Sequence, residues 1–250
     1  AQPGLFRLAL ALAVVTSHLS VLEIGRVAVL MFFYLSGFWV TRLWETRYSP
    51  NRLMTFYGSR WFRIWPLYFL SAAIAVVVSG KALRLVDVTL LGLGTSGGDP
   101  LGVAWSLDIE LQFYLLLPAL AWLLAKNWKA ATTLLVATAC IAGWAAYLSY
   151  GVMTVAQYLP PFILGMVTYL ARWQPSRRTA HLSLAAFLVF TVGAALFPFT
   201  SMFFVKDEPD PFHKDLFGFL WMLPALPYIA HSLTLPSGKF DRRLGDLSYP

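Results

Sequence analysis

The feature of this sequence that most restricts its fold is a series of long apolar segments that contain almost no charge. Only 12% of the 250 residues are charged, about half the fraction found in soluble domains. The uncharged windows are roughly 18–20 residues long, which is the length a helix needs to cross the hydrocarbon core of a bilayer. The sequence therefore predicts an all-α, polytopic transmembrane helical bundle.

Eight spans are expected, with ends good to about three residues. They are Leu5–Leu22, Val27–Leu43, Ile64–Ser79, Trp105–Leu124, Ala130–Ser149, Gln157–Ala171, Leu182–Phe199 and Leu216–Leu235. No soluble domain or internal repeat is evident, so we expect a single integral-membrane domain over residues 1–250. The segment Ala82–Gly102 is too polar and glycine-rich to span. We expect it to form an interfacial helix plus loop, or a re-entrant piece buried in protein.

The basic residues predict how the chain is oriented. If the N-terminus is cytoplasmic, 14 of the 19 basic residues lie on the cytoplasmic side and five on the other, as the positive-inside rule requires. The net charge of +7 then reflects topology and contact with anionic lipid, and we expect no nucleic-acid partner. The cytoplasmic set is Arg7, Arg42, Arg47, Arg52, Arg60, Arg63, Lys126, Lys129, Arg172, Arg177, Arg178, Lys239, Arg242 and Arg243.

Several other classes of protein are disfavoured by what the sequence lacks. The single cysteine, Cys140, cannot form a disulfide framework. No CxxC, HExxH or other metal-ligand spacing occurs, so we expect no bound metal. The first apolar segment lacks a small-residue cleavage site and a second span follows it closely, which favours a retained helix over a signal peptide.

Two ionisable residues, Arg7 and His18, are expected on one face of the first span. They are eleven residues apart, which is three helical turns plus about 20°, or roughly 16 Å along the axis. Ionisable groups at membrane depth are costly and usually face a cavity or a partner. Taken singly, Arg7 is explained equally well as a positive-inside anchor. For His18, a structural hydrogen bond to a neighbouring helix is the lesser alternative.

A pair of arginines, Arg60 and Arg63, precedes the expected third span with a spacing that places both on one helix face. Two guanidinium groups side by side suit a phosphate-rich ligand, because each can bond bidentately. Positive-inside charge alone also explains them. In the second span, Ser36 and Gly37 permit close helix packing.

The fourth span contains a carboxylate, Glu110, at the same predicted outer depth as His18. It could orient that imidazole and stabilise its charge, as in a general base, or be a structural carboxylate bonded to hydroxyls. Ser106 and Tyr114 share its helix face, and Asp108 is expected nearer the rim. The other histidines are weaker candidates: His181 and His213 read as solvated loop-edge residues, and His231 as a packing or interfacial residue.

Four motifs, in this order and over nearly the whole chain, resemble those of the membrane-bound acyltransferase family 3, the O-antigen and polysaccharide O-acetylase type. The first is a basic residue, ten residues and a histidine, here Arg7 and His18. The second, FFxLSG, is matched at Phe32, Phe33, Leu35, Ser36 and Gly37. The third, RxxR followed by a proline, is matched at Arg60, Arg63 and Pro66. The fourth, W[ST]LxxExxFY, is matched at Trp105, Ser106, Leu107, Glu110, Phe113 and Tyr114.

The resemblance implies an enzyme that moves an acyl group, taken here as acetyl, from cytoplasmic acyl-CoA to a hydroxyl of a glycan or glycolipid at the outer face of a bacterial cytoplasmic membrane. The expected catalytic residues are His18 and Glu110. Donor-binding residues would be Arg7, Arg60 and Arg63. The substrate-binding residues that we expect are Ser36, Trp105, Ser106 and Tyr114.

The chain departs from the family pattern in two places. Many relatives carry an acidic residue just before the paired phenylalanines, where this chain has Leu30. Relatives also continue beyond the closing LSYP into one or two further helices, so we expect a chain that is truncated at its C-terminus.

Two other functions stay open from the sequence. A proton-coupled transporter or flippase could use His18 and Glu110 as a proton relay, although no repeat relates the halves of the chain as in many secondary transporters. An acyltransferase could also act on a small cytosolic acceptor instead of a glycan.

Overall fold

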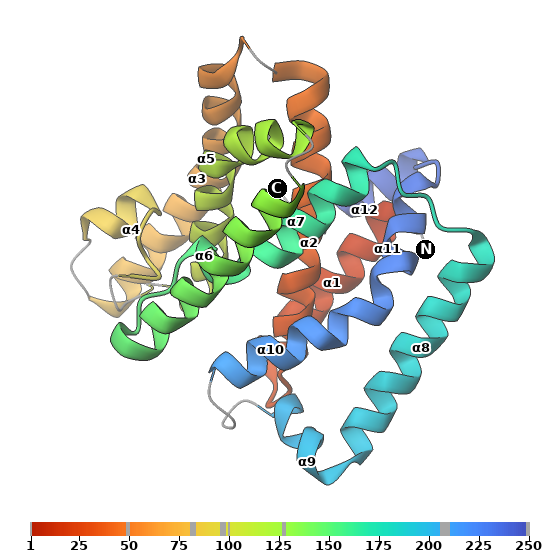
Figure 1. The fold of residues 1–250 in the computed structure, drawn as a ribbon. Coiled ribbons are helices and arrows are strands. Elements are labelled where there is room, and N and C mark those ends of the chain that lie inside the picture. The colour runs from red at the N-terminus through yellow and green to blue at the C-terminus, as the bar shows by residue number, and fades with distance from the viewer. Residues whose placement is uncertain are drawn as a thin grey trace. The chain divides into compact units, whose positions relative to one another are not determined.

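A computed structural model describes residues 2–48, 51–80, 84–95, 99, 101–126, 129–205 and 211–248. All regular structure in these ranges is helical, apart from an isolated bridge between Leu22 and Val205 (Figure 1). The elements are α1 Pro3–Leu19, α2 Ile24–Leu43, a π-helical η1 Trp44–Tyr48, α3 Leu53–Ser79, α4 Leu85–Thr89, α5 Trp105–Ala125, α6 Lys129–Tyr150, α7 Val155–Leu170, α8 Arg177–Leu196, α9 Pro198–Ser201, η2 Met202–Phe204, α10 Pro211–Met222, η3 Leu223–Ala225, α11 Leu226–Thr234 and α12 Lys239–Ser248.

The apolar helices confirm the predicted class of helical membrane protein. Within the described ranges, six helical stretches are long and apolar enough to cross a membrane, and α1 and α7 are shorter apolar helices. Together they account for all eight expected spans. Two details differ. The helix α3 begins at Leu53 and includes Arg60 and Arg63, which were expected before it, and the last span is divided into α10, η3 and α11.

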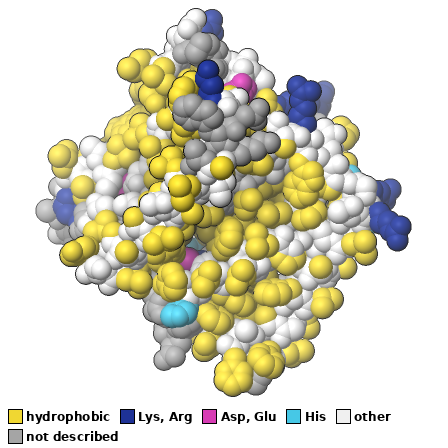
Figure 2. Space-filling view, viewed as in Figure 1, with side chains coloured by type: hydrophobic (Ala, Val, Ile, Leu, Met, Phe, Trp, Pro, Cys, Tyr) yellow, Lys and Arg dark blue, Asp and Glu magenta, His cyan; other side chains and the backbone are white. Residues whose placement is uncertain are grey.

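Hydrophobic side chains are the most abundant coloured type on the face drawn in Figure 2. Large apolar residues on several of the long helices are strongly exposed, among them Val77 and Val78 on α3, Ile141 on α6 and Val189 on α8. Such surfaces would be unfavourable in water and are typical of helices that contact lipid tails.

The chain forms two compact units, which we describe separately. The first unit contains residues 1–32 and 170–250, and the second contains residues 33–169. The boundary falls within α2, so its first residues belong to the first unit and the remainder to the second.

In the first unit, α12 fixes the start of α1. The carboxylate of Asp241 accepts hydrogen bonds from the backbone N–H groups of Gly4 (3.1 Å) and Leu5 (2.9 Å). These are among the first amides of α1, which have no partner within the helix. A Cβ atom on Gly4 would lie 1.8 Å from the Asp241 carbonyl oxygen, so the close approach of α12 requires glycine there.

A serine on α8 stabilises the break between α10 and α11. Pro224 and Pro227 interrupt the helical ladder there because proline has no N–H to donate. The hydroxyl of Ser183 donates to the Pro224 carbonyl (2.6 Å) and accepts from the Tyr228 N–H (3.1 Å). The Ser183 hydroxyl thus bridges a carbonyl and an N–H group, four residues apart, that would hydrogen-bond to each other in a regular α-helix.

In the second unit, α2 and α7 cross at glycines. A Cβ on Gly37 would lie 2.1 Å from the carbonyl oxygen of Phe162, and a Cβ on Gly165 would lie 2.0 Å from that of Tyr34. The two backbones therefore meet with no side chain between them. The Phe162 ring stacks between Phe33 and Phe113, with centroid distances of 4.6 and 4.0 Å.

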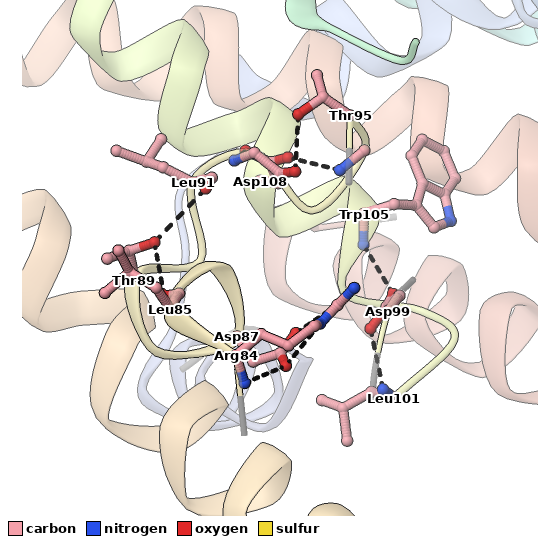
Figure 3. Close-up of polar contacts among 12 residues, drawn as sticks. Arg84, Leu85, Asp87, Thr89, Leu91, Thr95, Asp99, Leu101, Trp105 and Asp108 are labelled. Atoms are coloured by element: carbon pink, nitrogen blue, oxygen red, sulfur yellow. Dashed lines mark hydrogen bonds and ion pairs between the residues drawn. The ribbon is translucent and has the colours of Figure 1, made fainter. Parts of the chain in front are cut away.

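The segment between α3 and α5 was expected to be an interfacial helix plus loop or a re-entrant piece. Its described part contains the short helix α4, which is held against α3 by hydrogen bonds from Trp65 Nε1 to the Val88 carbonyl (2.7 Å) and from the Tyr68 hydroxyl to the Asp87 carbonyl (2.9 Å). The Nη2 atom of Arg84 lies 2.6 Å from Asp87 Oδ1, and this ion pair is drawn in Figure 3. The hydrogen bond between them lowers the pKa of Asp87 and raises that of Arg84. Residues 82, 83, 96–98 and 100 of this segment lie outside the described residues.

Candidate active site

The helix α1 carries the first two candidate residues. It runs unbroken from Pro3 to Leu19, so Arg7 and His18 share one helix as the sequence predicts. Eleven residues of regular helix place them on one face, about 16 Å apart along the axis. Arg7 is partly buried near the start of α1, and His18 is exposed in its last turn.

Arg7 belongs to the group of residues that holds α12 against the start of α1. The pKa of Asp241 is lowered even though its burial favours the neutral acid, because other effects prevail. Those effects are hydrogen bonds from the Ser237 hydroxyl and from the amides of Leu5 and Gly4, and the charge of Arg7. The negative charge of Asp241 thus fixes the part of α1 from which Arg7 projects.

The carboxylate of Glu110 is buried, with 4% of the residue exposed. Its Oε1 atom accepts hydrogen bonds from the hydroxyls of Ser36 on α2 and Tyr114 on α5. The shared face of Glu110 and Tyr114 is confirmed, and the contact with Ser36 brings two of the expected motifs together. This geometry corresponds to the hydroxyl-bonded carboxylate that the sequence left as an alternative to a catalytic partner.

The substrate-binding candidates in this unit have different surroundings. Ser106 hydrogen-bonds the Val103 carbonyl at 3.2 Å, one turn back on the chain. The Trp105 ring is partly buried and lies 5.6 Å from the Tyr158 ring and 6.5 Å from the Phe33 ring. Trp105 therefore belongs to the aromatic cluster around Phe33.

Arg60 and Arg63 lie three residues apart on α3 and are both partly buried. The Nε atom of Arg60 donates a long hydrogen bond to Ser59 Oγ (3.4 Å). Arg7 and His18 are in the first unit, whereas Arg60, Arg63 and Glu110 are in the second. The expected pairing of Glu110 with His18 and the joint role of the three arginines therefore stay predictions.

A second carboxylate on α5, Asp108, is also buried. The sequence places it nearer the rim than Glu110, and the residue is 0% exposed. Its oxygens accept from the backbone N–H groups of Gly92 (3.1 Å) and Gly94 (3.0 Å) and from Gln112 Nε2 (2.9 Å). Figure 3 shows it beneath the turn that contains Thr95. Asp108 therefore fixes the glycine-rich loop to the start of α5.

Gln112 extends this network. Its Oε1 atom accepts from the backbone N–H of Val155 at the start of α7 (2.9 Å). The sequence contained a usable signal, because an Asp and a Gln four residues apart share one helix face and glycine amides are common partners of buried carboxylates.

Comparison with known proteins agrees with the motifs. A family model for an acyltransferase domain, that of acyltransferase family 3, matches residues 2–250. The chain belongs to this family. The chain is 31% identical to Nodulation protein 10 of Rhizobium leguminosarum bv. viciae, in a match that covers 46% of the chain and 38% of that relative. The chain thus matches less than half of the relative's length. No solved structure matches it.

Proposed function

We propose that this family member transfers an acyl group, acetyl in the simplest case, from cytoplasmic acyl-CoA to a hydroxyl of a glycan or glycolipid at the extracytoplasmic face of a bacterial cytoplasmic membrane. The observation that carries the proposal is α1, a single apolar helix with Arg7 near one end and His18 exposed in its last turn. Family membership favours acyl transfer over the transport alternative. Glycan modification is preferred to a cytosolic acceptor because His18 is predicted at the outer end of α1.

In the proposed reaction, His18 acts as a general base. Its imidazole removes the proton from the acceptor hydroxyl while that oxygen attacks the carbonyl carbon of the thioester. The tetrahedral intermediate collapses, the C–S bond breaks, and the CoA thiolate takes the proton back from the imidazolium. The products are the O-acyl acceptor and CoA. A positioned general base contributes about 10²–10⁴-fold to such a rate.

The other candidate residues take supporting roles in this proposal. Arg7, Arg60 and Arg63 bind donor phosphates, because guanidinium groups bond phosphate oxygens bidentately. Glu110 stabilises the imidazolium form of His18, and its bonds to Ser36 and Tyr114 keep the carboxylate in a defined orientation. Trp105 and Ser106 lie at the start of α5, where we place part of the acceptor site.

The test uses membranes that contain the full-length protein and acetyl-CoA labelled in the acetyl group. We expect label in the glycan or glycolipid fraction, and about a hundredfold less with His18→Ala. His213→Ala, an exposed histidine on α10, is the matched control and should transfer normally. Normal transfer by His18→Ala would refute the general-base role. Absence of both transfer and CoA binding in the wild type would refute the acyl-CoA donor and favour the transporter.

A further inference from the structure

The first unit contains a cavity of about 310 Å³ between the start of α8 and the end of α11. Its lining residues are Arg177, His181, Tyr228, His231, Ser232 and Leu235. Neither the proposed chemistry nor the four motifs use any of them. His181 was expected at a loop edge, but it lies in the second turn of α8, four residues after Arg177.

The lining is basic and polar. It contains an arginine and two imidazoles, and none of the described residues that line it is acidic. Within the described chain, Arg177 and His181 form no salt bridge, so no carboxylate there neutralises Arg177. The positive end of the α8 dipole adds to the potential, because Arg177 is the first residue of that 20-residue helix.

Part of the lining is held in a fixed orientation. His231 Nδ1 lies 2.9 Å from the Pro175 carbonyl oxygen. A carbonyl can only accept, so Nδ1 carries a proton and the orientation of the ring is set. Ser232 donates its proton to the Ile229 carbonyl (2.7 Å). The mobile donors available to a ligand therefore come chiefly from Arg177 and His181, with the Tyr228 ring as an aromatic wall.

The cavity lies at the end of the unit where α1 begins. The rings of Tyr228 and Phe6 pack edge to face, with centroids 6.2 Å apart. Phe6 immediately precedes Arg7, the proposed donor-binding residue on α1. The volume is near the lower limit for small-molecule sites, so it suits one end of a long ligand better than the whole of it.

We propose that this cavity binds the 3′-phosphate of the CoA donor, with Arg177 as the principal contact and His181 as a second donor. This inference rests on the proposed function and adds to it a terminal phosphate subsite in the first unit. A phosphomonoester is a dianion with three acceptor oxygens, and Arg bonds such groups bidentately. The other donor phosphates stay assigned to Arg7, Arg60 and Arg63, as in the proposed function.

The test compares CoA with dephospho-CoA, which differ only in the 3′-phosphate, by calorimetry on the purified full-length protein. We expect the wild type to bind CoA on the order of tenfold to a hundredfold more tightly, as for one or two charge-assisted hydrogen bonds. Arg177→Gln should abolish this preference while leaving the affinity for dephospho-CoA unchanged, and His181→Gln should reduce it. The unchanged affinity shows that the variant is folded.

Arg178→Gln is the matched control, because Arg178 is adjacent on α8 and exposed but does not line the cavity. It should keep the wild-type preference. Equal binding of both ligands by the wild type, or a preference that survives Arg177→Gln, would overturn the subsite and leave the acyl-CoA donor supported. Binding of neither ligand would overturn both proposals.

A membrane lipid with a phosphomonoester headgroup presents the same chemistry, so a second arm distinguishes the two sources. The measurements are repeated in nanodiscs of phosphatidylcholine with and without phosphatidic acid. We expect the CoA preference to be the same in both. Loss of the preference in phosphatidic acid would assign the cavity to the lipid and overturn the CoA subsite.

Discussion

The closest approach of two helices in the second unit predicts a large effect of a single methyl group. In Gly37→Ala, the new Cβ would lie 2.1 Å from the carbonyl oxygen of Phe162 and 2.9 Å from its carbonyl carbon, whereas ordinary contacts are 3.4–4 Å. The obstacle is backbone, so no rotamer change can relieve it. The helices α2 and α7 must therefore separate by about 1 Å or more, which also loosens the stack of Phe33 on Phe162.

The expected destabilisation of Gly37→Ala is the difference between two opposing effects. Overpacking a tight interface costs about 1–3 kcal/mol, and a backbone obstacle places this substitution in the upper half of that range. Alanine is favoured over glycine within a helix by about 1 kcal/mol. The net destabilisation is therefore about 1–2 kcal/mol, or a decrease in Tm of roughly 2–8 °C for a chain of this length.

The assay is thermal unfolding of the purified protein in one detergent, with Gly58→Ala as the control. Gly58 lies within α3 in the same unit, and a Cβ there would have nothing within 4 Å. The control should keep or raise the wild-type Tm, since only the helix preference operates. A Gly37→Ala variant as stable as Gly58→Ala would refute the close crossing of α2 and α7.

Substitutions at three further residues test other parts of the structure. Ser183→Ala leaves the Pro224 carbonyl and the Tyr228 amide without their shared partner, so we expect a loss of about 1–3 kcal/mol and faster hydrogen exchange at the Tyr228 amide; unchanged exchange would contradict this. Asp108→Ala removes the acceptor for two loop amides, so a protease should cleave the 92–94 loop faster than in wild type, and Asp108→Asn, which retains an acceptor oxygen, should fall between them. Asp241 has a pKa below its ordinary value of 3.8, so its stabilisation is complete above that value and is lost as pH falls through the lowered pKa. Asp241→Asn should therefore have a Tm that varies less with pH below about 4 than that of the wild type. Parallel curves of Tm against pH would count against the bonds from the Gly4 and Leu5 amides to the Asp241 carboxylate.

The apolar spans were predictable because length and hydropathy are properties of contiguous sequence. The start of α3 was not, because residues 53–63 contain two arginines that make them too polar to count as membrane-spanning, although nothing in them stops a helix. The break in the last span was signalled by Pro224 and Pro227. The hydrogen bonds from Ser183 to this break join residues some forty positions apart. They depend on which helices become neighbours, and that is not a local property of the sequence.

The contacts of the candidate site likewise divide into those within one helix, which the sequence could predict, and those between helices, which it could not. The bond between Tyr114 and Glu110 follows from helical spacing, which predicted their shared face and left a hydroxyl-bonded carboxylate as an alternative. The bond from Ser36 joins residues 74 positions apart and needs the packing of α2 against α5. The cavity beside Arg177 and His231 likewise requires α8 and α11 to be adjacent. From the sequence alone these residues read as positive-inside charge and as packing.

Glu110 and Asp108, two residues apart on α5, show why a buried carboxylate alone does not define a catalytic group. Asp108 accepts from backbone amides of a loop and from Gln112. The fold fixes the positions of those donors, so the Asp108 carboxylate serves to hold the loop against α5. Glu110 accepts from the hydroxyls of Ser36 and Tyr114, and a hydroxyl can rotate to another acceptor without moving the backbone. A change of partner is therefore far less costly at Glu110 than at Asp108, which is what a carboxylate must tolerate if it stabilises a charge that appears only during the reaction.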